Sequence, residues 1–210
     1  MGDQIKAIFD VAEKTFSPVD ILVNNAGIAI AGEMEKIPME KWERILATNL
    51  KSVIYGCRTF IPLMEAQGGG HIVNVGSNAG IASLPEMGPY NMTKAGVISL
   101  SETLRIELAA KNIGVTLLAP TFFKTRLMES FYAPDDRQCR LANRFFDRSL
   151  CTADDVAART WHAVRRNRFY VIPQVDGKLV WLAKRIAPEL YFRLMAFGYR
   201  HGWADKLLGI

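Results

Sequence analysis

Cysteine and histidine are scarce in this sequence of 210 residues, which has three of each. Cys57, Cys139 and Cys151 are widely spaced, form no CxxC pair and have no histidine nearby, so we expect free thiols and no metal site. Long apolar runs of about eighteen residues are absent, and the N-terminus lacks the basic start and apolar core of a signal peptide. These absences predict a cytoplasmic protein.

A strong charge excess is also lacking, because the net charge is only +5. The charge is uneven, since residues 159–210 hold ten Lys and Arg against three Asp and Glu. These basic residues alternate with Leu, Ile, Phe and Trp and accompany no nucleic-acid motif, so we expect no nucleic-acid partner. Half of the residues are apolar, which at this length predicts a substantial buried core.

Two kinds of apolar segment alternate along the chain. Short β-branched runs are typical of parallel strands that are covered on both faces, and stretches with helical spacing separate them. The expected strands are 20–24, 71–75, 115–119 and 169–172, and the expected helices are 3–16, 38–67, 89–112 and 156–166. This alternation predicts an α/β protein with a parallel sheet.

Two segments fall outside this alternation. The stretch from Thr121 to Leu150 is too long for an ordinary connection, which is typical of a lid or binding segment. Residues 173–210 mix aromatic and aliphatic residues with Lys and Arg, and Pro188 divides them into two short helices. Basic residues beside Trp and Phe favour peripheral membrane contact, although such a tail could instead cap the substrate cleft or a subunit interface. We therefore expect a catalytic unit over 1–172 and an amphipathic helical extension over 173–210.

Tyr90 and Lys94 stand four residues apart in an expected helix, so they share one face of it. A phenol becomes a useful base near pH 7 if its pKa falls by about three units, which takes roughly 4 kcal/mol that a nearby ammonium can supply. The same spacing is also common in pairs on helix surfaces. Ser77 lies thirteen residues before Tyr90, directly after an expected strand, where open α/β sheets bind ligands.

Several motifs, taken in their order and spacing, resemble the short-chain dehydrogenase/reductase (SDR) family. They are NNAG at 24–27, Asn49 within ATNL, the GHIVNVGS strand at 70–77, YxxxK at 90–94, Pro120 with Thr125, and Asp155-Val-Ala157. The resemblance covers about residues 1–172. It implies a Rossmann-like doubly wound parallel sheet, NAD or NADP as the cofactor, and a homo-oligomer formed through the helices expected over 39–67 and 89–112.

The resemblance also implies a role for each matched residue. Tyr90 would be the general acid in reduction and the general base in oxidation, and Lys94 would lower the Tyr90 pKa and hydrogen-bond the nicotinamide ribose. Ser77 would hold the substrate oxygen, and Asn49 would help hold a water that links Lys94 to a proton relay. The other cofactor contacts implied are Asn25, Ala26 and Gly27 on the adenosine side, Pro120, and Thr125 at the nicotinamide amide.

Two features depart from the family pattern. Thr121 stands where the family usually has Gly after the proline. In addition, no G-x-G-x-x-G or TGxxxGxG loop precedes NNAG. The resemblance therefore implies that the first strands and the phosphate loop, about 60 or more residues, would lie before residue 1. In the family, the end of this second strand selects between the two cofactors, so the choice between NAD and NADP stays open.

The segment from 121 to 146 is rich in apolar side chains, and the resemblance places the substrate-binding loop there. Those side chains are Phe122, Phe123, Leu127, Met128, Phe131, Tyr132, Phe145 and Phe146. They favour a lipophilic alcohol or carbonyl substrate such as a steroid, retinoid or long-chain ketone, although they could instead pack the lid onto the core or a partner subunit. A 3-oxoacyl thioester is the alternative substrate. The alternative to an oxidoreductase is a non-catalytic SDR fragment that cannot hold the cofactor by itself.

Overall fold

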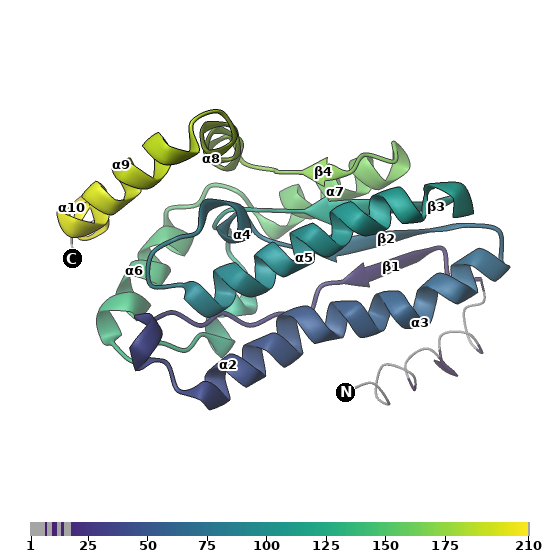
Figure 1. Ribbon diagram of the computed structural model, residues 1–210, viewed down its shortest axis with the longest axis horizontal. Coiled ribbons are helices and arrows are strands. Elements are labelled where there is room, and N and C mark those ends of the chain that lie inside the picture. Colours follow the sequence, from purple (N-terminus) through teal and green to yellow (C-terminus); the bar gives the residue numbers. More distant parts are fainter. Residues whose placement is uncertain (1–6, 8–9, 12–13, 15–17, 210) are drawn as a thin grey trace.

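A four-stranded parallel sheet forms the centre of the chain in the computed structural model, which describes residues 7, 10–11, 14 and 18–209 (Figure 1). The strands are β1 (Ile21–Asn24), β2 (Gly70–Val75), β3 (Ile113–Leu118) and β4 (Tyr170–Val171), and they pair in chain order. Val23 pairs with Val73, and Asn74 pairs with Leu117. The predicted parallel α/β architecture is confirmed, and β1 forms one edge of the described sheet.

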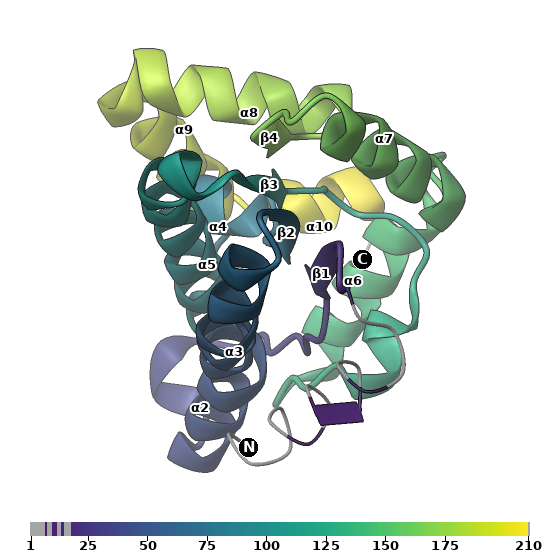
Figure 2. The same ribbon diagram turned by 90° about the vertical axis from the view of Figure 1, so that its right-hand side faces the viewer.

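Helices cover both faces of this sheet (Figure 2). On one face lie α3 (Ser52–Ala66) and α5 (Gly88–Glu107), and on the other lies α7 (Ala153–Arg165). The layer between α3, α5 and the strands is apolar and buried, and it includes Val53, Met64, Val97, Leu104, Ile72 and Val115. Each such side chain stabilises the fold by about 1.5–3 kcal/mol relative to exposure, so this layer fixes α5 against the sheet.

One long helix was expected from 38 to 67, and the structure divides it into three parts. They are α2 (Met39–Ile45), a π-helix η2 (Leu46–Lys51) and α3. The wider turn of the π-helix contains Asn49, which is fully buried. Single turns of π-helix are frequent at functional sites, and here the turn carries a predicted catalytic residue.

The lid segment contains regular structure that the sequence analysis did not predict. A 3-10 helix, η4 (Arg126–Ser130), precedes α6 (Asp136–Asp147). Asp135 caps α6, because its carboxylate accepts a hydrogen bond of 2.7 Å from the backbone N–H of Arg137. Thr152 caps α7, since Thr152 and Asp155 form a capping box at the start of this helix.

Three helices follow β4, namely α8 (Val175–Ile186), α9 (Pro188–Arg200) and α10 (Trp203–Leu208). Pro188 begins α9, so the predicted break is confirmed, while α10 was not predicted. These helices pack on the rest of the chain, where Gly177 O accepts a hydrogen bond from Asn78 and the Tyr191 hydroxyl donates to Ala82 O. The division of the chain after residue 172 stays a prediction.

Short elements complete the chain between the major ones. They are η1 (Met34–Lys36), α4 (Ala79–Ala82) and η3 (Ala109–Lys111). The predicted helix over 3–16 lies largely outside the described residues. Among the residues that the structure describes, no helix has the length and hydropathy needed to cross a bilayer.

Candidate active site

Ser77 lies just beyond the carboxyl end of β2, as predicted from the sequence. Its hydroxyl oxygen accepts a hydrogen bond of 3.1 Å from the backbone N–H of Ala79, which orients the buried side chain at the start of α4. The backbone N–H of Asn78 donates to Pro120 O at 2.9 Å. The structure therefore places the chain after β2 beside the chain after β3, and so brings Ser77 and Pro120 into one region.

Tyr90 and Lys94 occupy the first turns of α5 and are both buried. The Lys94 ammonium lies 5.8 Å from the centroid of the Tyr90 ring and donates a 2.8 Å hydrogen bond to Val75 O at the end of β2. The Ser77 hydroxyl lies close enough to the Tyr90 phenol to influence its pKa. The three predicted residues Ser77, Tyr90 and Lys94 are thus brought together, with α5 supplying the last two.

Burial governs the protonation of Tyr90. Removal of its phenol from water raises the pKa of Tyr90, and the polar interaction with Ser77 acts in the opposite direction. A protonated phenol is the form that a general acid requires. The lowering of the Tyr90 pKa by Lys94, which the family resemblance implies, stays a prediction.

Burial also lowers the pKa of Lys94 from 10.5 to about 8, because the charged ammonium loses most of its hydration. Between about pH 8 and 10.5 the unfolded chain holds this proton and the folded chain does not, so Lys94 contributes a rise in stability with pH of up to ~1.4 kcal/mol per unit. Above pH 9 the raised pKa of the Cys57 thiol acts in the opposite direction. We expect Lys94→Met to abolish this rise in the free energy of unfolding, measured by urea titration at several pH values. Parallel pH profiles of the variant and the wild-type protein would contradict this expectation.

Asn49 joins three segments of the site through its buried amide. Its Oδ1 accepts from the backbone N–H of Ile28 at 2.8 Å, and its Nδ2 donates to Ile28 O at 2.9 Å and to the Thr93 hydroxyl at 3.2 Å. Thr93 in turn donates to Tyr90 O at 2.9 Å. Asn49 therefore fixes the loop after β1 against α5. Its role in a water relay to Lys94 stays a prediction.

Gly27 leaves a space between two of the predicted catalytic groups. An added Cβ at this glycine would lie 3.5 Å from both Asn49 Oδ1 and Lys94 Nζ. Asn25 and Ala26 precede it and are exposed just after β1. The loop after β1 thus brings its backbone beside the Lys94 ammonium. The cofactor contacts of Asn25, Ala26 and Gly27 stay a prediction.

Thr125 has a bonding pattern that its predicted role did not anticipate. It is exposed and its hydroxyl accepts from the backbone N–H of Leu127 at 3.0 Å, so it caps η4. Its contact with a nicotinamide amide stays a prediction. Thr121, which departs from the family pattern, bonds through its backbone N–H to Gln174 Oε1 at 3.0 Å, just before α8. This backbone therefore contacts the tail.

Two residues that position this site were not predicted from the sequence. Thr93 connects Asn49 with Tyr90, and its only sequence signal is its place inside the YxxxK motif. Gly177 permits α8 to approach the site, because a Cβ there would lie 2.8 Å from Thr121 Cγ2 and 3.0 Å from Asn78 Nδ2. No sequence pattern connects Gly177 with Asn78, which lies 99 positions earlier in the chain.

Comparison with known proteins identifies the family. The family model for short chain dehydrogenases matches residues 2–136. The chain is 32% identical over 215 residues to the putative oxidoreductase SadH of Mycobacterium tuberculosis, covering 94% of this chain and 78% of that protein. It is 38% identical over 119 residues to the uncharacterized oxidoreductase YusZ of Bacillus subtilis, covering 57% of this chain. A solved short chain dehydrogenase/reductase from Burkholderia phymatum in complex with NAD is 30% identical, with a TM-score of 0.85 over 90% of this chain and 73% of that chain. The chain belongs to the short-chain dehydrogenase family.

The chain matches less than half of the length of one of these relatives. The match spans 42% of the Bacillus subtilis protein, and the family match begins at residue 2. The match does not confirm the expectation that a phosphate-binding segment precedes residue 1. The membership shows an oxidoreductase family with a Rossmann-like fold, and the assignment of individual residues to catalytic roles is a proposal.

Proposed function

We propose that this protein is an NAD(P)-dependent oxidoreductase that interconverts a lipophilic alcohol and its carbonyl compound. The observation that carries this proposal is the buried grouping of Ser77, Tyr90 and Lys94, in which Tyr90 lies near Ser77 and beside the Lys94 ammonium. Asn49 connects this grouping to the loop after β1. These are the four side chains that the family resemblance assigns to catalysis.

The residues around Gly27 fit a nicotinamide nucleotide. Lys94 is buried with its ammonium next to Val75 O, so it has further N–H groups to offer a ribose hydroxyl. The Gly27 backbone leaves room beside that ammonium, and Asn25 and Ala26 are exposed on the same loop. Asn25, Ala26, Gly27, Asn49, Tyr90, Lys94, Pro120 and Thr125 would hold the cofactor. The choice between NAD and NADP remains open.

In this proposal the side chains handle the substrate oxygen and its proton. The nicotinamide, when bound, accepts a hydride from the alcohol carbon or returns it to the carbonyl carbon. Tyr90 takes the hydroxyl proton in oxidation and returns it in reduction. Ser77 donates a hydrogen bond to the substrate oxygen and so stabilises developing negative charge. The Lys94 ammonium favours the phenolate form of Tyr90 while the proton is away.

The surroundings of Tyr90 support an apolar substrate. Tyr90 belongs to a buried apolar cluster with Ile28 and Ile30, and Leu127 and Phe131 from the lid segment pack against that cluster. Some aromatic side chains of the lid segment pack against each other, since the Phe122 and Phe145 rings are stacked with centroids 4.8 Å apart. The apolar lid residues nearest Tyr90 therefore favour a lipophilic alcohol or ketone over a small hydroxy acid.

A series of 2-alkanols of increasing chain length tests both the activity and the substrate class. Each methylene buried against the lid contributes about 0.8 kcal/mol, so kcat/KM should rise roughly fourfold per added carbon until the pocket is filled. The measurement is the nicotinamide absorbance change with NAD and with NADP. Turnover that is flat across the series, or that appears only with a 3-oxoacyl thioester, would contradict the lipophilic substrate class.

The alternative proposal is a family member that keeps the four side chains and does not bind the cofactor by itself. The edge position of β1 favours it for this chain, because the outer side of β1 is open in the described residues and Val23 is exposed there. The melting temperature of the protein with and without NAD or NADP separates the two proposals. A rise with either nucleotide supports the oxidoreductase, and the absence of any rise supports the alternative.

We also propose that the protein forms a homo-oligomer, as the family resemblance implies.

We further propose that the helix α8 contacts membrane surfaces. Val175, Leu179, Leu182 and Ile186 recur at helical spacing on α8 and are exposed, whereas Gly177, on the opposite face, is buried. Lys178 and Arg185 lie along one side of this apolar stripe. An exposed apolar stripe with basic flanks is typical of a helix that lies in the interface of an anionic bilayer.

A vesicle flotation assay tests the membrane contact. Each exposed leucine that enters the interface contributes about 1 kcal/mol, so Leu179→Ser with Leu182→Ser should weaken binding to phosphatidylserine vesicles by at least about tenfold. Ile106→Ser with Leu150→Ser is the matched control, because these side chains are exposed outside the tail. A wild-type protein that does not float with these vesicles at low salt would contradict the contact.

A further inference from the structure

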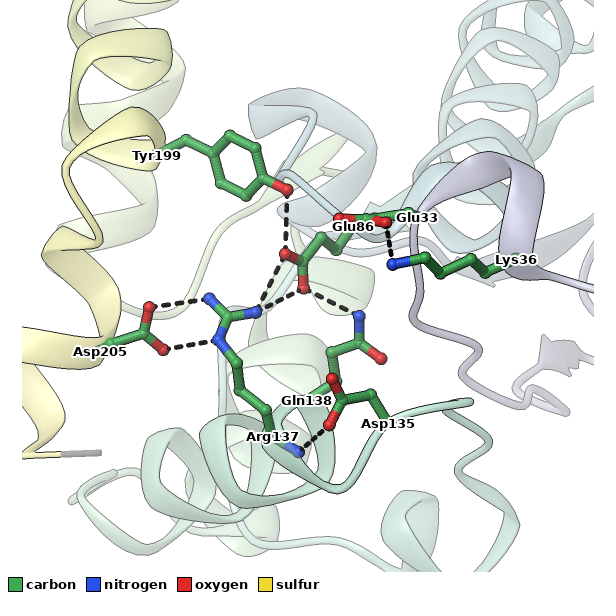
Figure 3. Close-up of polar contacts among 8 residues, drawn as sticks. All are labelled: Glu33, Lys36, Glu86, Asp135, Arg137, Gln138, Tyr199 and Asp205. Atoms are coloured by element: carbon green, nitrogen blue, oxygen red, sulfur yellow. Dashed lines mark hydrogen bonds and ion pairs between the residues drawn. The ribbon is translucent and has the colours of Figure 1, made fainter.

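A cluster of charged side chains joins segments that lie far apart in the sequence (Figure 3). Both carboxylate oxygens of Glu86 accept hydrogen bonds of 3.0 Å from Arg137 Nη1, and Glu86 also accepts from Gln138 and from the Tyr199 hydroxyl at 3.0 Å. The other side of the Arg137 guanidinium donates to the two Asp205 oxygens at 2.9 and 2.8 Å. One guanidinium thus connects two carboxylates from different parts of the chain.

These contacts connect three functional segments. Glu86 lies four residues before Tyr90, Arg137 lies in the first turn of the lid helix α6, and Tyr199 and Asp205 belong to α9 and α10. The Glu86 backbone also accepts a 2.6 Å hydrogen bond from Gly32, on the loop that follows NNAG. The cluster therefore connects α6, α9 and α10 to the segment that precedes α5, the helix that contains Tyr90 and Lys94.

The geometry is that of a strong interaction rather than of a loose surface pair. The side chains of Glu86, Arg137 and Asp205 are only 12%, 32% and 22% exposed. Ionised partners and a bidentate guanidinium give shorter and stronger hydrogen bonds than neutral pairs. Glu86 also has a φ of 57°, a left-handed conformation that is uncommon outside glycine and that persists where surrounding contacts hold it.

We propose that Arg137 is a positioning residue, which clamps the lid helix α6 and the C-terminal helices α9 and α10 over the loop that leads to Tyr90. The C-terminal helices are then part of the enclosure of the substrate site. Arg137 acts through Glu86 and Asp205 and does not touch the reacting atoms. The effect on substrate binding rests on the proposed function, whereas the clamp itself can be measured without any cofactor or substrate.

Asp205→Asn tests the clamp because it keeps the shape of the side chain and removes its charge. We expect backbone amides of α6 and α10 to exchange hydrogen about tenfold faster, which corresponds to ~1.4 kcal/mol of lost local stability. The matched control is Lys111→Gln, which breaks an ion pair of 2.7 Å with Glu65 that lies outside these segments. Hydrogen exchange by mass spectrometry on the full chain gives the rates segment by segment.

The outcomes separate the clamp from general destabilisation. Faster exchange confined to α6, α9 and α10 supports the proposal. Exchange in α6 that matches the Lys111→Gln control, or that rises equally in α3, would overturn it. In an active preparation, Asp205→Asn should raise KM for 2-decanol several-fold and leave kcat within about twofold. If α6 exchanges faster but KM is unchanged, the Arg137 clamp has no role in substrate binding. If the wild-type protein shows no turnover, that result counts against the proposed function and not against the clamp.

Discussion

Tyr90→Phe should lower kcat/KM for nicotinamide-dependent oxidation of a long-chain 2-alkanol by about a thousandfold, the middle of the range that a positioned acid or base supplies. The substitution removes the hydroxyl that carries the proton and keeps the buried ring that packs with Ile28 and Ile30. The polar interaction with Ser77 is lost, but the apolar contacts remain. Steady-state kinetics at several pH values measures the loss.

The control for this variant is Tyr55→Phe, which removes a hydroxyl from a partly exposed tyrosine on α3. That change should leave kcat/KM within about twofold, because surface substitutions away from a site cost little. Circular dichroism spectra and melting temperatures should agree for both variants and the wild-type protein. A Tyr90→Phe protein that is folded and retains more than a tenth of the wild-type kcat/KM would show that Tyr90 is not the residue that takes the substrate proton.

Gly80→Ala should produce the largest loss of stability among conservative single substitutions in the site. A Cβ at this position would lie 2.6 Å from the Lys94 carbonyl carbon, 2.7 Å from Ala95 N and 2.9 Å from Lys94 O. Backbone atoms of α5 cannot rotate away as a side chain can, so α4 and α5 must separate. We expect a loss of about 3 kcal/mol in the free energy of unfolding, as for an overpacked core position, together with a loss of activity because Lys94 moves.

Gly88→Ala is the matched control for this prediction. Gly88 begins α5, and its added Cβ would meet Trp42 carbon atoms at 3.6 and 3.9 Å, which are ordinary contacts. This variant should unfold within about 1 kcal/mol of the wild-type protein. Chemical denaturation of both variants gives the comparison. Equal stability of Gly80→Ala and Gly88→Ala would contradict the close approach of α4 to α5.

The sequence predicted those parts of the fold that local pattern determines. Four β-branched runs became the four parallel strands, and the helix expected over 156–166 became most of α7. Pro188 separated two helices because its ring fits only the first turn of a helix. In each case the physical cause acts within a few residues, so the sequence alone contains it.

The parts that were missed depend on contacts between distant segments. The π-turn around Asn49 is specified by a buried amide that bonds to both backbone groups of Ile28, and no local propensity encodes it. The helix α6 has a signal that was not used, because Asp135 precedes an amphipathic stretch as an N-cap residue does. The Arg137 clamp joins positions 86, 137, 199 and 205, so only the folded chain brings it together.

In the candidate site, too, some features follow from the sequence and others only from the folded structure. The resemblance to the family assigned Ser77, Tyr90 and Lys94, and the structure places them together at the carboxyl end of β2. Thr125 shows the limit of such assignment, because its hydroxyl caps η4 in this structure. The motifs therefore predicted which residues come together at the end of β2, whereas the catalytic and cofactor-binding roles of all these residues stay predictions.

The most direct test of hydride transfer at this site follows the hydrogen itself. A 2-decanol deuterated at its carbinol carbon is incubated with the protein and oxidised NAD or NADP, and the nicotinamide is analysed by mass spectrometry. The account predicts that the reduced nicotinamide gains one deuterium with the wild-type protein, and that Tyr90→Phe slows this transfer by about a thousandfold. A folded protein that binds the nucleotide and oxidises the alcohol without moving deuterium to the nicotinamide would contradict it.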